Sequence, residues 1–142
     1  ESRGGLKRTT SNYVLIHGYS KKKYFLSKKE IDSLSKEIDM ERVLTTLKNN
    51  KIVKASDTWK TIPFYKPSKS DECPNGYKGR VGIHEVLEVS DAIKDLVTKG
   101  VPDNIIEEQA RQEGMITMLE DGFVKAIQGL TSIEEILSAT AE

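Results

Sequence analysis

The sequence predicts an α+β fold, in which a small antiparallel sheet with short helices is followed by an all-helical C-terminal subdomain. Two observations support this prediction. Segments of strand composition, separated by turn residues, occur only before residue 90. From residue 90 onward, apolar residues recur at helical spacing between capping residues and glycines. A chain of 142 residues can form one domain or two small ones.

The strand segments of the first half are short and are separated by turns. They are residues 12–16, 52–53, 59–65 and 80–89. Pro63 interrupts the third segment, and residues 67–79 are rich in Pro, Ser, Asp, Asn and Gly, which predicts a loop. The last segment gives the clearest signal. It has apolar residues on both faces of its alternating pattern, so we expect it to be at least half buried.

Two short helices are predicted between these strands. Ser27 and Glu30 form the S-x-x-E capping box, which predicts a helix that begins after Ser27 and ends near Ile38. Asp39 can cap a second helix, and Asn50 stands where that helix should end.

Four helices are predicted after residue 90. Ser90 can cap the first, and the glycines at 100, 114 and 129 are the expected ends of the first three. The second begins at Pro102 or Asp103. The third is indicated by apolar residues at every fourth position: Met115, Leu119, Phe123 and Ile127. Thr131 and Glu134 form a capping box that predicts the start of the fourth.

The composition predicts a folded domain outside the membrane. Apolar residues make up 37% and charged residues 31% of the chain. No apolar run approaches the ~20 residues of a membrane-spanning helix, and the N-terminus lacks the apolar segment of a signal peptide. The single cysteine, Cys73, excludes an internal disulfide. The chain does not begin with Met, so we expect it to be a fragment or to carry added residues.

The charges are divided unevenly along a chain whose net charge is zero. Residues 1–80 hold 18 Lys and Arg against 9 Asp and Glu, a balance of +9. Residues 81–142 hold 4 against 13, a balance of −9. This division is compatible with two solvated faces of opposite sign, or with attraction between the halves or between neighbouring subunits.

A glycine-rich run points to a known family. Residues 73–86 read Cys-Pro-Asn-Gly-Tyr-Lys-Gly-Arg-Val-Gly-Ile-His-Glu-Val. The run resembles the G-Y-[KR]-G-R-x-G-I-[HY]-E block of the type II secretion and type IV pilus assembly ATPases. Shorter matching blocks follow in order, at residues 113–115, 121–122 and 129–135. The resemblance is good over residues 73–142 and weaker over residues 20–72.

The resemblance implies that this chain is the C-terminal, non-catalytic domain of a cytoplasmic hexameric ATPase that powers type IV pilus assembly or type II secretion. It implies partners for the parent protein, namely neighbouring ATPase subunits and an inner-membrane platform protein. The parent would lie at the inner membrane through these partners, without inserting into it. ATP and magnesium would belong to the parent, and we expect no cofactor in this chain. We do not expect nucleic acid to be a partner.

The resemblance also suggests a division of the chain. Residues 1–15 do not resemble the family and are expected to be disordered or foreign to the native protein. Residues 16–89 would form an α+β subdomain at the position of the family's metal-binding loops, and residues 90–142 a helical C-terminal subdomain.

Many members of the family carry two C-x-x-C pairs that form a four-thiolate zinc site. In this sequence the corresponding positions are His17 with Ser20, and Ser70 with Cys73. The spacing is kept, but only one thiol remains, and serine is a poor zinc ligand. We therefore interpret these positions as a degenerate site that holds no metal.

The sequence does not contain the G-x-x-x-x-G-K-[ST] motif that cradles phosphates, so we expect no ATP hydrolysis by this chain and assign no catalytic residue. The resemblance makes Arg80 a candidate nucleotide-sensing arginine in the full protein, since a guanidinium can neutralise charge on phosphate. A surface arginine paired with a carboxylate is the alternative interpretation.

A different class of function also fits the sequence: a free-standing adaptor or nucleic-acid-binding module that reuses this fold. Aromatic residues at 59, 64 and 65 lie among the lysines at 54, 60, 66 and 69. Stacking and phosphate contacts could both come from such a segment. An ordinary amphipathic strand with lysines outside is the simpler explanation.

Overall fold

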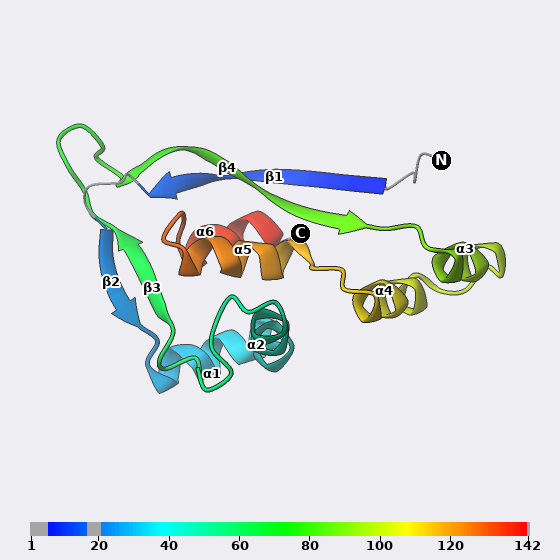
Figure 1. Ribbon diagram of the computed structural model, residues 1–142. Helices are drawn as coiled ribbons and strands as arrows, with labels where there is room; N and C mark the ends of the chain where they lie inside the picture. Colours follow the sequence, from blue (N-terminus) through cyan, green and yellow to red (C-terminus); the bar gives the residue numbers. More distant parts are fainter. Residues whose placement is uncertain (1–5, 17–20, 142) are drawn as a thin grey trace.

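The computed structural model describes the backbone of residues 6–16 and the whole of residues 21–141 (Figure 1). Strands and helices alternate in the first half, and only helices follow residue 90. The elements, in chain order, are β1 (Leu6–Ile16), β2 (Lys21–Phe25), α1 (Lys28–Glu37), α2 (Met40–Asn49), β3 (Pro63–Pro67), β4 (Tyr77–Leu87), α3 (Asp91–Thr98), α4 (Asp103–Gln112), α5 (Met118–Ile127) and α6 (Ile133–Thr140). The predicted α+β class is confirmed.

The described strands form two separate antiparallel pairs. The longer pair is β1 with β4, in which Leu6 faces Leu87 and Ile16 faces Tyr77, with two irregularities in between. The shorter pair is β2 with β3. Helices α5 and α6 lie beneath the β1–β4 ribbon, while α1 and α2 lie at the far side of them (Figure 1).

Three strand predictions need correction. Residues 1–15 were expected to be disordered or foreign. From Leu6 onward they form most of β1, which includes the predicted strand at residues 12–16, and that they are foreign stays a prediction. The first half of this strand is polar and pairs with β4, which no local pattern predicts. Residues 52–53 form a bend rather than a strand, and β3 begins only at Pro63. Proline is tolerated at the first position of a strand, where its missing N–H does not interrupt the ladder.

The helix caps explain where most helices begin. The predicted box at α1 is present, because the Glu30 amide donates to Ser27 Oγ at 3.3 Å and the Ser27 amide donates to Glu30 Oε2 at 2.9 Å. Hydrogen bonds from the Ser27 amide and the Ser27 hydroxyl to the Glu30 carboxylate lower the pKa of Glu30. The predicted caps Asp39 and Ser90 are also confirmed.

The last two helices begin at other residues than predicted. Helix α5 begins at Met118 rather than Met115, because Thr117 and Glu120 form a capping box of their own. Helix α6 is capped by Ser132, whose hydroxyl accepts from the Glu135 amide, and not by Thr131. Thr131 is fully buried.

One hydrophobic core joins the two halves of the chain. The rings of Trp59 and Phe123 meet edge-on with centroids 5.5 Å apart, and Phe64 and Phe123 do the same at 6.3 Å. Around them pack buried residues of α2, α5 and α6: Met40, Val43, Leu47, Ala126, Ile133 and Ile136. Lys21 adds a polar tie, since its ammonium donates to the Gly129 carbonyl at 3.0 Å. The division of the chain into subdomains at residue 90 stays a prediction, but residues from both sides of this division form one core.

Helices α3 and α4 form an arm that projects from the end of β4 (Figure 1). Each has a single fully buried residue, Ile93 in α3 and Ala110 in α4. Two ion pairs join α4 to the body: Arg42 with Glu108 at 3.2 Å, and Arg111 with Glu120 at 3.2 Å. Among the described helices, none is long and apolar enough to cross a bilayer.

Candidate functional site

The loop between β3 and β4 contains two of the predicted metal positions, Ser70 and Cys73. The structure brings them together, because their backbones exchange two hydrogen bonds of 3.1 Å and the Cys73 amide also reaches Ser70 Oγ at 3.1 Å. Gly76 continues the turn with a φ of +79°. A Cβ added at Gly76 would lie 2.6 Å from the Cβ of Pro67, so both the backbone and the space favour glycine.

The thiol of Cys73 and the hydroxyl of Ser70 are already hydrogen-bonded within the protein. The thiol of Cys73 is buried and donates to the Tyr77 carbonyl at 2.8 Å, while the Ser70 hydroxyl accepts from a backbone amide. In the described part of the chain, no three His, Cys, Asp or Glu side chains are placed to hold a metal ion. His17 and Ser20 lie outside the described residues. One thiol and one hydroxyl do not fit a four-thiolate zinc site.

Tyr77 anchors the loop to the helical half. Its hydroxyl lies 2.7 Å from the hydroxyl of Ser132, which is buried at the start of α6. Burial raises the pKa of Tyr77, so the phenol stays neutral at physiological pH. A hydrogen bond between two neutral hydroxyls therefore fastens this loop to α6.

We expect a chelator to leave the stability of the chain unchanged. Backbone bonds close the turn between Ser70 and Cys73, and the Tyr77 hydroxyl ties the loop to α6. Thermal unfolding with and without EDTA checks this expectation, with metal content measured on the same sample. A fall of several degrees in the melting temperature on adding EDTA would show that a metal contributes to folding.

Arg80 lies on β4 with an exposed side chain. No side chain of residues 21–141 forms an ion pair with it. The alternative that Arg80 serves a surface ion pair within this part of the chain is therefore not supported. The guanidinium is accessible to a group outside the described residues.

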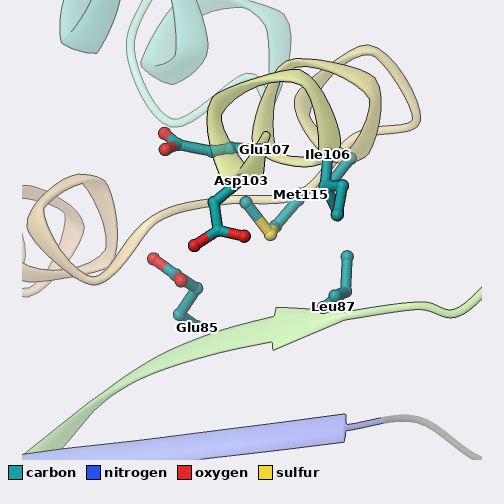
Figure 2. A pocket seen from close by; sticks show the side chains of 7 residues that line it. Glu85, Leu87, Asp103, Ile106, Glu107 and Met115 are labelled. Atoms are coloured by element: carbon teal, nitrogen blue, oxygen red, sulfur yellow. The ribbon is translucent and has the colours of Figure 1, made fainter. Parts of the chain in front are cut away.

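A groove between β4 and α4 was not predicted from the sequence. It measures about 450 Å³. Figure 2 shows the carboxylates of Glu85 and Asp103 facing each other across it, and Leu87 and Ile106 facing each other at its other end. Met115 lies between these two ends. The groove thus combines an apolar floor with negative charge.

A signal for this groove was present in the sequence. Residues 103, 106, 107 and 110 recur at helical spacing, and they alternate between acidic and apolar side chains. All four line the groove, with Glu85 and Leu87 of the opposite strand. The strand was predicted correctly, but nothing in the sequence indicates that α4 lies opposite it.

Comparison with known proteins defines the class of protein first. The family described as "Type II/IV secretion system protein" matches residues 28–138. This match covers most of the chain, and the chain belongs to that family. The resemblance of residues 73–86 to secretion and pilus ATPases is thereby confirmed.

Three individual relatives show which proteins of this family the chain is similar to. The chain is 42% identical over 82 residues to the type IV pilus assembly ATPase PilB of Pseudomonas aeruginosa, and 46% identical over 80 residues to PilB of Thermus thermophilus. It is 41% identical over 81 residues to the type II secretion system protein E of Xanthomonas campestris. These matches cover 56–58% of this chain but only 9–14% of the relatives' length.

Proposed function

We propose that this chain is the C-terminal, non-catalytic domain of a hexameric ATPase that drives type IV pilus assembly or type II secretion. Membership of the secretion family over residues 28–138 is the observation that carries the proposal. The relatives named as ATPases are about seven to eleven times longer than the matched segment, which leaves room for a separate nucleotide-binding core.

The parent protein would supply ATP binding and magnesium. The sequence of this chain has no G-x-x-x-x-G-K-[ST] motif, whose backbone amides and lysine hold nucleotide phosphates. The groove beside β4 is negatively charged and would repel a triphosphate. We therefore assign no catalytic residue to the chain, and no metal site to His17, Ser20, Ser70 and Cys73.

Release of phosphate from ATP tests the non-catalytic role directly. We expect the purified chain to release phosphate at the background rate, with and without magnesium. A rate above background that survives a further purification step would make the chain an enzyme and overturn the proposal.

Arg80 is the residue that we propose to act on nucleotide in the parent ATPase. Because its exposed side chain makes no ion pair within residues 21–141, Arg80→Ala should change the stability of the chain by less than about 0.5 kcal/mol. In the parent, the same change should slow ATP turnover by about 10³-fold, the lower end of what arginine fingers contribute.

Lys78 provides the matched control for Arg80. It is also cationic and exposed, and it lies two residues away on β4. Lys78→Ala should leave both stability and turnover near those of the unchanged protein. Equal turnover in the two variants would remove Arg80 from the proposed nucleotide site.

The proposed partners are neighbouring ATPase subunits and an inner-membrane platform protein, with the parent held on the cytoplasmic side of the membrane through them.

The second candidate function, an adaptor or nucleic-acid-binding module, rests on the lysines and aromatic rings of β2 and β3. Lys66 lies over the Tyr24 ring at 4.6 Å, and Lys21 lies over the Tyr65 ring at 5.4 Å. Salt-dependent binding of single-stranded DNA at micromolar protein would favour this second function.

A further inference from the structure

The acidic groove has a free charge and an apolar floor. Within residues 21–141, Asp103 forms no ion pair, and its carboxylate faces that of Glu85 across the groove (Figure 2). The side chain of Glu107, which adds a third carboxylate, is 55% exposed. The described residues offer no cluster that could hold a metal ion. The charge of the groove therefore suits a cationic side chain better than a bound metal.

A second surface, the outer face of β2, has the opposite charge. The register pairs Lys23 with Tyr65 and Tyr24 with Phe64, so Lys23 and Phe25 lie on the face turned away from the buried Phe64. Phe25 is 51% exposed, and the Lys23 ammonium lies 5.5 Å from its ring centroid. We call Lys23 and Phe25 the β2 face, since Tyr65 is only partly exposed and lies against Lys21 and Gly129. It presents a cation beside an exposed aromatic ring.

The groove and the β2 face lie at opposite ends of the molecule, since β2 is far from α4 in Figure 1. One chain cannot place its own β2 face in its own groove. A second copy can, and the contact is then head-to-tail, because each chain offers a different surface to each neighbour. The +9 balance of residues 1–80 and the −9 balance of residues 81–142 favour the same orientation.

We propose that the β2 face of one copy of this chain docks in the acidic groove of a second copy. The Lys23 ammonium would meet the carboxylates of Asp103 and Glu85. The Phe25 ring would cover the floor formed by the apolar lining residues: Leu87, Ile106 and Met115. This inference rests on the proposed function, in which the chain contacts neighbouring subunits, and it names the two surfaces of that contact.

Complementation between two charge-reversed variants tests the contact. Asp103→Lys reverses a charge in the groove and leaves the β2 face unchanged. Lys23→Glu reverses the charge of the β2 face and leaves the groove unchanged. By sedimentation velocity at low salt, we expect the unchanged chain to self-associate with increasing concentration and each variant to associate about tenfold more weakly. A 1:1 mixture of the two variants should form a heterodimer, because one intact groove meets one intact β2 face. Half-molar salt should weaken association of the unchanged chain.

Two matched variants control for charge alone. Glu41→Lys reverses an exposed acid in the first turn of α2, as Asp103→Lys does in the first turn of α4. Lys60→Glu reverses an exposed lysine outside the β2 face. Both should associate like the unchanged chain. Circular dichroism checks that all four variants are folded.

Several results would overturn the inference. They are an unchanged chain that stays monomeric at hundreds of micromolar, a variant mixture that forms no heterodimer, and control variants that weaken association equally. Binding of single-stranded DNA that Lys23→Glu abolishes, by a chain that stays monomeric, would assign the β2 face to nucleic acid instead. None of these results bears on ATP hydrolysis, so failure here leaves the proposed non-catalytic role to its own test.

Discussion

Replacing Glu120 with alanine is expected to lower the free energy of unfolding by about 3–5 kcal/mol, because the change removes the buried partner of an arginine that is itself largely buried. The Glu120 side chain is 2% exposed and that of Arg111 15% exposed, with 3.2 Å between Oε1 and Nη1. The same carboxylate accepts from the Thr46 hydroxyl at 3.0 Å and from the Thr117 amide at 2.9 Å. Glu120 thus joins α2, α4 and the start of α5.

Glu107 offers a matched control for this experiment, because it pairs with the same arginine at the same distance of 3.2 Å. Its side chain is 55% exposed, so water can replace it. Glu107→Ala should therefore cost less than about 1 kcal/mol in urea or thermal unfolding. Equal losses in Glu120→Ala and Glu107→Ala would show that burial of the pair contributes little to stability.

Replacing Phe123 with alanine is expected to cost about 3–5 kcal/mol as well, through lost burial and the cavity left behind. Phe123 has no exposed surface, and its ring contacts both Trp59 and Phe64. Phe25→Ala is the matched control, because the Phe25 ring is half exposed, and we expect a loss below about 1 kcal/mol. Urea unfolding of the three proteins measures both differences.

The Phe123 experiment also tests how the two halves depend on each other. Trp59 lies in the first half, so its fluorescence should report the loss of packing against Phe123 from α5. We expect Trp59 fluorescence and circular dichroism to unfold together in Phe123→Ala, at a lower urea concentration than in the unchanged chain. Separate transitions would mean that residues 16–89 and 90–142 fold as independent units, as the predicted division allows.

Much of the local structure could be predicted from short patterns. Patterns of residues within a few positions of each other predict three features: the capping box of Ser27 and Glu30, the cap at Ser90, and strand β4, which ends at Leu87. The box of Thr117 and Glu120 has the same pattern, but Met115 lies at the apolar spacing of α5, so the spacing alone places the start of this helix too early.

The rest depends on contacts between distant residues. No local pattern shows that the polar segment from Leu6 pairs with β4, or that Glu120 is buried against Arg111. The candidate site follows the same rule. The turn at Ser70 and Cys73 was expected from spacing, whereas the groove exists only because α4 lies opposite Glu85 and Leu87.

Because both halves of the chain contribute to one core, the core can form only late in synthesis. Trp59 and Phe64 leave the ribosome well before Phe123 and Ile136, which complete the core around them. Until then, the large apolar side chains of the first half have nothing from α5 or α6 to cover them. A nascent chain that pauses before residue 123 therefore exposes an apolar aromatic surface to which chaperones can bind. It completes its core only after the last helices have been translated.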